Sequence, residues 1–424
     1  MATSHPQAAG ARRSRWGESG RMLTALRYAQ FRRYWLGNLA AVGGQQMMWV
    51  AQGWLVYELT NSAVYLGYVG LATAAPAILL NLAGGVVADR FDQRKVILST
   101  QVVMAVSVFL LGLLTALDIV QVWQVLVVAF ISGSMQAFNN PARQSIFPQL
   151  LDRRDLPNAV ALNSVVWQGT RIVAPATGGI VVAAFGEAVT LMLCSAGFLV
   201  LGLIVVGLAV EQRVPQVRGS MFGELNEGIA FIRTHFLFAF LIGMSFFNSF
   251  FGFSAQQLMP VFAVDILDIG SAGLGMLLSL SGVGSILGII ALGYAGDVKH
   301  KGMLIVGGAI MYGVFIILFA QSTWAPLSFV AVFLMGASSS VYMITVQTAL
   351  QLRVPDELRG RVMGIYGMTY NVGPLGAVQA GFIADSFGAP TALALGGIAI
   401  ILFAGGVAFS RREVRRLEAA AVPA

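Results

Sequence analysis

Residues 66–98 read LGYVGLATAAPAILLNLAGGVVADRFDQRKVIL, and residues 274–306 read LGMLLSLSGVGSILGIIALGYAGDVKHKGMLIV. The two stretches align without gaps, and the alignment pairs Asp89 with Asp297. Each begins with an apolar run of the length that a helix needs to cross a bilayer, about 20 residues at about 1.5 Å per residue. This match predicts an internal duplication: two similar halves in the same orientation, related by an axis along the membrane normal.

A second match between the halves places Phe185-Gly186 opposite Phe387-Gly388. Chance similarity is the alternative explanation, because apolar segments draw on few residue types. Duplication has a functional consequence, since two similar rigid bundles around one cleft can rock and open the cleft to either side.

The composition of the whole chain is that of a membrane protein. Of its 424 residues, 57% are hydrophobic and 11% are charged, and the mean hydropathy is +0.77. Too few polar side chains remain to cover a water-soluble surface. Apolar residues occupy consecutive positions, as in 199–210, whereas the strands of a membrane barrel would alternate. We predict an all-α polytopic membrane protein with twelve transmembrane helices in two six-helix bundles, the helices lying near residues 35–57, 65–88, 96–116, 121–142, 159–183, 188–210, 236–258, 271–295, 303–321, 326–349, 362–384 and 389–409.

The 26 lysines and arginines divide the gaps between these segments into two kinds. All of them except Arg171 lie in the tails or in alternate gaps, and the other gaps carry acids only. The basic gaps hold Arg90, Arg94, Lys95, Arg143, Arg153, Arg154, Arg213, Arg218, Arg233, Lys299, Lys301, Arg353, Arg359 and Arg361. The acidic gaps hold Glu58, Asp118, Glu187, Asp265, Asp268 and Asp385. By the positive-inside rule, both termini and the basic gaps are predicted to be cytoplasmic, in a bacterial inner membrane. The net charge of +7 is then a topology signal with attraction to anionic lipid, and not a footprint for nucleic acid.

The charge pattern also predicts the order of the domains. We expect a cytoplasmic tail at 1–30, a six-helix bundle at 31–210, a cytoplasmic linker at 211–234 with a short amphipathic helix near 222–232, a second six-helix bundle at 235–410 and a cytoplasmic tail at 411–424. The first thirty residues have no apolar core, so no cleaved secretory signal is expected. Cys194 is the only cysteine, which excludes an intramolecular disulfide. The three histidines are scattered and no P-loop motif occurs, so we expect no metal and no other cofactor.

The segment after the second predicted helix, 85–95, carries a glycine, an Asp-Arg pair and two further basic residues: Gly85, Asp89, Arg90, Arg94 and Lys95. An aspartate at the C-terminal end of a helix faces the negative end of the helix dipole, and Arg90 or Arg94 could compensate it. Gly85 would let a neighbouring helix approach closely. The alternative reading is a solvated turn with ordinary positive-inside charge.

This segment resembles the cytoplasmic signature of the major facilitator superfamily, between its helices two and three. The resemblance implies that the aspartate and its basic partners latch the two halves together on the cytoplasmic side in the outward-open state. The latch then releases when the inside opens. The second half keeps Asp297 but has Val298 where the arginine should be, so its latch should be weaker.

The fifth predicted helix contains Gly169, Arg171, Pro175, Gly178 and Gly179. Pro175 removes one intrahelical hydrogen bond and the glycines admit a facing helix, so we expect a bend or pivot here. The segment resembles the antiporter motif of the same superfamily, which is associated with exporters, although Ala174 replaces its central glycine. Helix packing alone is the other explanation for the proline and the glycines. Arg171, a cation inside a span, is a candidate functional residue, or its side chain snorkels to the surface.

Longer stretches, 138–164 and 351–363, resemble the bacterial export branch of the superfamily that includes siderophore exporters, and the resemblance covers residues 26–412. In this superfamily, helices one, four, seven and ten line the central cleft. The candidate cavity residues on these helices are Gln45, Trp49, Gln52, Gln136, Asn139, Asn248, Gln256, Tyr342 and Thr345. Uncharged polar groups beside the aromatic surface of helix seven suit an amphipathic organic molecule.

The sequence therefore predicts a monomeric secondary exporter of a drug or a siderophore-like product, and not an enzyme. Protons as the coupling ion follow from the family alone, because no acid lies in helix one and no arginine in the middle of helix four. The coupling residue is unassigned. An uptake transporter for a sugar or metabolite, a membrane-embedded lipid-modifying enzyme and a non-transporting receptor are the alternatives.

Overall fold

The computed structural model describes residues 23–209, 230, 232–296 and 301–410, and every regular element in these ranges is helical. The first group of long helices comprises α2 (Ala29–Thr60), α3 (Ala63–Arg90), α4 (Gln93–Ala116), α5 (Val122–Ile146) and α6 (Leu156–Val206). The second group comprises α8 (Phe236–Phe247), α9 (Phe253–Gln257), α10 (Met259–Val261), α11 (Gly270–Ala295), α12 (Lys301–Gln321), α13 (Ala325–Arg353), α14 (Asp356–Thr369), α15 (Gly373–Phe387) and α16 (Ala389–Ser410). Residues 1–22 of the predicted N-terminal tail, most of the predicted linker helix, the C-terminal tail and Asp297 lie outside the described residues.

The described ranges contain nine helices that are long and apolar enough to cross a membrane. The longest of these spans two of the segments predicted from sequence, because α6 continues through a bend at Gly186. Large apolar side chains point outward from several helices, with Leu79, Leu203 and Leu402 between 68% and 78% exposed. Such a surface is stable against lipid and not against water. The prediction of an all-helical membrane protein is confirmed.

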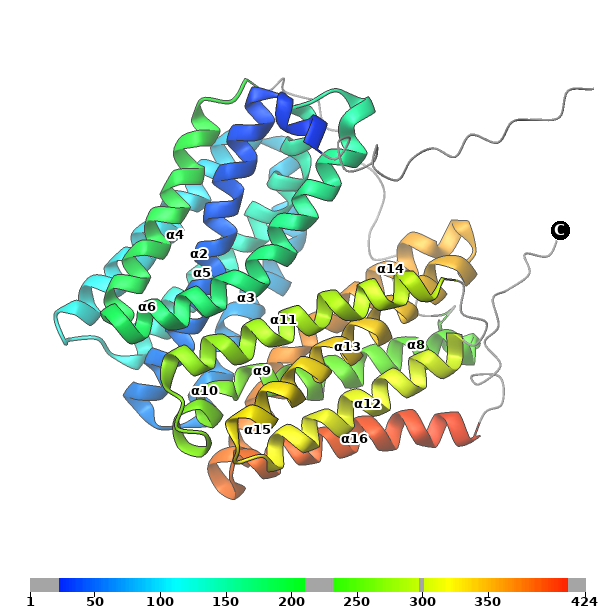
Figure 1. The fold of residues 1–424 in the computed structure, drawn as a ribbon. Helices are drawn as coiled ribbons and strands as arrows, with labels where there is room; N and C mark the ends of the chain where they lie inside the picture. Colours follow the sequence, from blue (N-terminus) through cyan, green and yellow to red (C-terminus); the bar gives the residue numbers. More distant parts are fainter. Residues whose placement is uncertain (1–22, 210–229, 231, 297–300, 411–424) are drawn as a thin grey trace, which may run out of the picture.

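The helices form two groups, α2–α6 and α8–α16, that lie side by side (Figure 1). In the first group α3 packs on α5, and in the second α11 packs on α13. These two contacts use equivalent residues. A Cβ atom at Gly133 would collide with the carbonyl of Thr73, and one at Gly336 would collide with the carbonyl of Ser281. The alignment that opens the sequence pairs Thr73 with Ser281, so the duplication extends to the way helices pack.

The second sequence match has a structural counterpart as well. Gly186 has φ 83° and ψ 173°, and Gly388 has φ 88° and ψ 148°. Positive φ of this kind is readily available only to glycine. Both glycines therefore turn the chain between two helices in the same way.

Two predicted spans differ from the helices that form. The seventh, predicted at 236–258, continues to Ile266 through the π-helical segments η4 (Asn248–Gly252) and η5 (Phe262–Ile266). A π-turn alters the regular pattern of backbone hydrogen bonds, and in η4 the carbonyl of Gly252 accepts one from the Tyr312 hydroxyl at 3.1 Å. The eleventh predicted span, 362–384, is divided by the 3₁₀ segment η6 (Tyr370–Val372), which ends two residues before Pro374. Proline cannot donate a backbone hydrogen bond.

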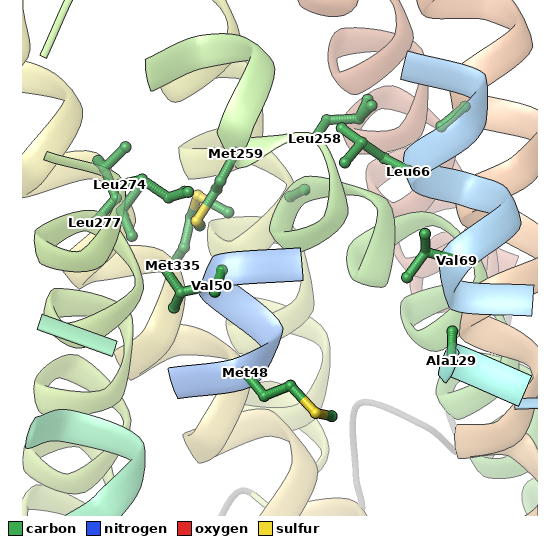
Figure 2. Close-up of a cluster of buried hydrophobic side chains, with 14 of the residues drawn as sticks. Met48, Val50, Leu66, Val69, Ala129, Leu258, Met259, Leu274, Leu277 and Met335 are labelled. Atoms are coloured by element: carbon green, nitrogen blue, oxygen red, sulfur yellow. The ribbon is translucent and has the colours of Figure 1, made fainter. Parts of the chain in front are cut away.

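Apolar side chains from both groups form a continuous core. Figure 2 shows Leu258 pointing toward Leu66, and Met259 lying among Leu274, Leu277 and Met335. Packing between the two groups is therefore close where α9 meets α3 and where α10 meets α2.

Each group has a basic side and an acidic side. We define the basic side as the helix ends near residues 27, 90–94, 146–156 and 353–361, and the acidic side as the ends near 58–63, 116–122, 265–270 and 385–389. The two groups approach each other at the acidic side and diverge toward the basic side (Figure 1). The contacts between the groups, residue by residue, define the candidate site.

Candidate functional site

Two glycines, one in each group, bring helices of the opposite group into backbone contact. A Cβ atom at Gly67 in α3 would lie 3.0 Å from the carbonyl oxygen of Ala377 and 2.7 Å from the Cα of Val378, both in α15. A Cβ atom at Gly275 in α11 would collide with the carbonyl oxygen of Pro175 in α6. The repeat alignment pairs Gly67 with Gly275. Only glycine at these positions allows the helices to pack so closely.

In a second pair of contacts, the glycines lie on α15 and α6, and they meet the backbone of α3 and α11. A Cβ atom at Gly381 in α15 would lie 2.8 Å from the carbonyl oxygen of Ala63, and one at Gly179 in α6 would collide with the carbonyl oxygen of Ser271. The alignment pairs Ala63 with Ser271. Counting back from the matched bends at residues 186 and 388 pairs Gly179 with Gly381. The α3–α15 and α6–α11 contacts are therefore the same contact made twice, as a two-fold relation between the groups requires.

Polar contacts join the groups at the acidic side. The Asp385 carboxylate accepts hydrogen bonds from the Ser62 hydroxyl at 2.5 Å and from the Ala63 backbone N–H at 2.7 Å. Asp385 thereby caps α3 from the opposite group, where the N-cap residue Ser62 makes no side-chain cap of its own. The Tyr57 hydroxyl donates to the Asp265 carboxylate, a second bond between the groups.

At the basic side, the glycines have open space. Nothing lies within 4 Å of a Cβ atom built at Gly85, Gly293, Gly360 or Gly364. No described residue comes within 4 Å of the Cβ position of Gly85, whereas the adjacent Gly84 packs against the carbonyl of Ala137 in α5.

The gate motif is held within the first group. The Arg94 guanidinium pairs with the Asp92 carboxylate at 3.0 Å and donates to the backbone carbonyl of Leu208 at 3.0 Å. Asp92 also caps α4 by accepting from the Arg94 N–H, and these bonds hold the pKa of Asp92 below its ordinary value. Arg90 and Lys95 are exposed. Asp89 lies in the last turn of α3.

The antiporter-like segment, residues 169–179 of α6, packs against α2 of its own group and against α11 of the other group. Gly178 meets Met47 of α2, with 3.2 Å from its Cβ position to the Met47 Cα, while Pro175 and Gly179 meet α11. Nothing lies within 4 Å of a Cβ atom at Gly169. In α6 only Gly186 has non-helical dihedrals. The backbone dihedrals of α6 are therefore helical at Pro175, and the chain turns at Gly186, between the fifth and sixth predicted spans.

Arg171 lies at the boundary between the groups. Its carbonyl oxygen is 3.0 Å from the Cβ position of Gly282 in α11. Its side chain is exposed, and within the described residues no acid forms an ion pair with it. The Tyr312 hydroxyl of the second group is near enough to interact with it electrostatically. A cation without an acidic partner thus faces the space between the groups.

Most of the predicted cavity residues are buried, and five carry a buried polar atom without a hydrogen-bond partner. These residues are Gln52, Gln136, Asn139, Asn248 and Tyr342. Buried polar groups in folded proteins are almost always paired, so unpaired ones call for an explanation. Asn248 begins the π-helical segment η4, and π-turns occur frequently at functional sites.

The other predicted cavity residues differ in exposure. Gln45 and Thr345 are buried, and Thr345 donates to the Val341 carbonyl at 2.6 Å. Gln256 is half-buried. Trp49 is 50% exposed, although Gln45 and Gln52 share its helix. Trp49 precedes Gly53 by one turn, and Gly53 faces Pro260 of the second group at 3.5 Å, so Trp49 lies on the side of α2 that faces the other group.

The predicted fourth span ends at residue 142, whereas α5 continues to Ile146, so Arg143 lies in the last turn of this helix. Pro141 does not end the helix. The Arg143 guanidinium donates to the Asn38 side chain at 3.0 Å, and Asn38 donates to Asn163 at 3.1 Å. The signal that could have found this group is the polar cluster at residues 138–144, opposite asparagines on two other helices.

A group of tyrosines in the second helix group was also missed. The hydroxyls of Tyr366 and Tyr370 are 2.5 Å apart, and Tyr366 also donates to the Met343 carbonyl at 3.5 Å. Tyr342 and Tyr312 are buried nearby in α13 and α12. The i, i+4 spacing of Tyr366 and Tyr370 was the available signal.

Within the described ranges no group of His, Cys, Asp or Glu could hold a metal ion. The arrangement instead combines lipid-facing helices, two equivalent halves and unpaired polar atoms between and within them. These features define a multi-pass membrane transporter of the kind built from internal repeats.

Comparison with known proteins agrees with this assignment. The family model for transmembrane secretion effectors matches residues 21–424. The chain belongs to this family, within the major facilitator superfamily. The resemblance to its export branch, inferred above from sequence motifs, is confirmed.

Three relatives illustrate the family. The chain is 25% identical to the staphyloferrin A transporter of Staphylococcus aureus, over 87% of this chain and 93% of the relative. It is 24% identical to macrolide efflux protein A of Streptococcus pyogenes, over 92% and 97%. It is 24% identical to the enterobactin exporter of Shigella boydii, over 79% and 80%. Among solved structures, a bacterial homologue of the human lysosomal transporter Spinster, in an inward-facing, unoccupied conformation, has a TM-score of 0.71 at 12% identity, over 93% of this chain and 97% of that one.

Proposed function

We propose that this protein is a secondary active transporter that exports an amphipathic small molecule by alternating access. In the proposed topology, twelve transmembrane helices form six-helix bundles at 31–210 and 235–410, joined by a cytoplasmic linker at 211–234. Both termini are cytoplasmic in a bacterial inner membrane, so the basic side faces the cytoplasm. The protein works as a monomer, because one chain supplies both bundles.

One observation carries this proposal: the helix groups touch through two equivalent glycine contacts at the acidic side, and diverge at the basic side. In α3 these contacts use residues 63–70, and in α11 they use 271–282. Small residues with backbone contact permit sliding and rocking, because no long side chains interlock across them. Rotation about these contacts would open the acidic side as the basic side closes.

We propose export rather than uptake because of the names of the relatives, and an amphipathic cargo because of the cavity residues. Relatives spanning most of the chain are named for efflux or export of macrolides and enterobactin. The unpaired polar atoms of Gln52, Gln136 and Asn248 would orient a cargo by hydrogen bonds. Aromatic rings of η4 and its flanks, such as Phe246 and Phe250, stack on each other and offer apolar area beside Asn248. We propose protons as the coupling ion, on family grounds.

Dye accumulation in cells with and without the protein tests the direction. We expect cells that make it to retain less Hoechst 33342, less ethidium or less erythromycin than cells with an empty vector, and a protonophore to abolish the difference. Purified protein in liposomes should then move the same compound when a proton gradient is imposed. Higher accumulation would indicate uptake, and an altered lipid extract without flux would indicate an enzyme. Equal accumulation across the panel together with no flux in liposomes would count against the proposal.

Replacement of Asp89 by asparagine tests the cytoplasmic latch. Removing its charge should weaken the closed basic side, lower transport several-fold and favour the inward-open state, with expression unchanged. Asp152→Asn is the matched control, because Asp152 is also at the basic side, is 58% exposed, and accepts hydrogen bonds from Tyr28 and Arg154, both of the first group. Transport equal to the unmodified protein at equal expression would remove the latch role from Asp89.

Replacement of Arg171 by lysine tests the role of this cation. Lysine keeps the charge but loses the planar guanidinium, which binds anions and carbonyls through two parallel hydrogen bonds. We expect a folded protein whose turnover or KM for transported compounds changes at least several-fold. Arg154→Lys, at an arginine that is 80% exposed, should leave both unchanged. Unaltered kinetics in Arg171→Lys would favour a snorkelling side chain with no part in the path.

A further inference from the structure

Arg143 is a cation inside the first helix group with no acidic partner among the described residues. One terminal nitrogen of its guanidinium donates to Asn38 at 3.0 Å. Its Nε atom is buried and has no hydrogen-bond partner. Arginine is always charged in proteins, and a buried charge is costly unless it is paired. Arg143 is therefore a cation that lacks a negatively charged partner among the described residues.

A polar cavity of about 200 Å³ adjoins this guanidinium. Its lining residues are Tyr34, Asn38, Asn140, Arg143, Gln144, Phe147, Asn163 and Trp167. They come from α2, α5, the 3₁₀ segment η2 (Phe147–Gln149) and the first part of α6, at the basic side of the first group. The neutral polar residues supply donors, and three aromatic rings supply apolar area. This volume suits a small anionic group with a ring attached, and it is too small for a whole large cargo.

Asn38 and Asn163 hold the guanidinium in place. Asn38 is 2% exposed, accepts from Arg143 and donates to the Asn163 side chain at 3.1 Å. This chain of bonds engages one terminal nitrogen and leaves the buried Nε without a partner. The guanidinium also lines the cavity, and a guanidinium can bind a planar acceptor through two parallel hydrogen bonds.

We propose that Arg143 and its cavity form a binding site for the carboxylate of an amphipathic, anionic cargo, at the cytoplasmic mouth of the transport path. The proposal rests on the proposed function, since the site opens to the cytoplasm only in that topology. It also narrows the cargo class from amphipathic molecules in general to those that carry a carboxylate.

The cavity connects to a deeper cation. Trp167 lines the cavity and is 38% exposed, and Arg171 follows it by one turn on the same side of α6. An anionic group that leaves Arg143 can thus meet Arg171 next, nearer the centre of the helix and at the boundary between the groups. Two cations in succession, Arg143 on α5 and Arg171 on α6, would guide an anion inward.

Binding of a matched acid and amide to the purified full chain tests the site. The probes are 1-naphthaleneacetate and its uncharged amide, measured by calorimetry in nanodiscs of phosphatidylcholine. We expect the acid to bind at least about tenfold more tightly than the amide, as a charge-assisted pair predicts. Arg143→Gln should abolish this preference and Arg143→Lys should reduce it, because lysine lacks the fork. Arg154→Gln, at an exposed arginine of the same side, should preserve it.

Trp167 reports where the probe binds. The acid should change tryptophan fluorescence in the unmodified protein, and the change should be lost in Trp167→Phe at an acid concentration that calorimetry shows to saturate that variant. Equal affinity for acid and amide in the unmodified protein, or a preference retained in Arg143→Gln, would overturn the proposal. Should Arg143→Gln fail to fold, Arg143→Lys remains the test, and an undiminished preference in it would overturn the proposal.

A phospholipid headgroup offers the same anionic chemistry, and native mass spectrometry from phosphatidylglycerol nanodiscs separates it from cargo. A lipid retained by the unmodified protein, lost from Arg143→Gln and not displaced by the acid would assign the site to lipid and overturn the proposal. These binding measurements need no flux. A protein that prefers the acid but moves nothing would sink only the proposed function, and one that exports dyes without any acid preference would sink only this site.

Discussion

Replacing Gly179 by leucine is expected to abolish transport and to displace the protein from the arrangement described here. A Cβ atom at this position would already collide with the carbonyl oxygen of Ser271 and lie 2.9 Å from the Cα of Gly275. Both obstacles are backbone atoms, which cannot rotate away as a side chain does. Overpacking of this kind costs about 1–3 kcal/mol, which shifts a two-state equilibrium about 5- to 150-fold. The groups should separate at the acidic side and close at the basic side.

Distances between spin labels measure this shift. Phe91 and Leu352, 62% and 65% exposed, lie at the basic side of the first and second group and can be replaced by cysteine in a Cys194→Ser background. The label distance should shorten in Gly179→Leu, and in Gly381→Leu at the equivalent contact. Gly405→Leu is the control, because nothing lies within 4 Å of its Cβ position. A normal label distance and normal transport in Gly179→Leu would show that this contact does not control the states.

Replacing Asp385 by alanine is expected to weaken the contact between the two groups at the acidic side, because it removes the hydrogen bonds of the Asp385 carboxylate. The carboxylate accepts the first N–H of α3 at 2.7 Å and the Ser62 hydroxyl at 2.5 Å, and its charge complements the positive end of the α3 dipole. At about 1 kcal/mol for each bond at this exposed position, the loss amounts to about 2 kcal/mol, or about a 30-fold shift toward the open acidic side. Asp385→Asn keeps an acceptor and should fall between.

The label pair at positions 91 and 352 and the turnover of an exported dye measure this effect. Asp118→Asn is the control, since Asp118 is exposed at the acidic side, and asparagine tolerates its φ of 56°. A label distance that is shortest in Asp385→Ala, intermediate in Asp385→Asn and longest in the unmodified protein would support the role of Asp385 as the cap of α3. Identical label distances in all three would mean that Asp385 contributes nothing to the closed state.

Much of the fold could be predicted because membrane-spanning helices depend on local composition. Apolar runs gave the helices, and the match between 66–98 and 274–306 predicted a repeat that the glycine contacts of α3 and α11 now display. The errors arose where tertiary contacts decide the backbone. The π-turns of η4 are one case, since the Tyr312 hydroxyl that bonds the Gly252 carbonyl lies 60 residues away in sequence.

The candidate site was less accessible to sequence reasoning. The antiporter-like motif indicated that Gly178 and Gly179 would admit neighbouring helices, but not that their neighbours are α2 and α11. In the sequence, Asp385 is one of several acids in the gaps between spans. Only the structure shows that its carboxylate caps α3. The setting of Arg143 depends on asparagines of two other helices, and no local pattern reports such a pairing.

The paired glycine contacts of α3–α15 and α6–α11 have an implication for ancestry. Because each half carries both surfaces of that contact, a chain half this long would be self-complementary, and two copies could close the same interface isologously across a symmetry axis. Fusion of two such copies into one gene would free each copy to diverge, so that a cation such as Arg143 could occupy one half alone.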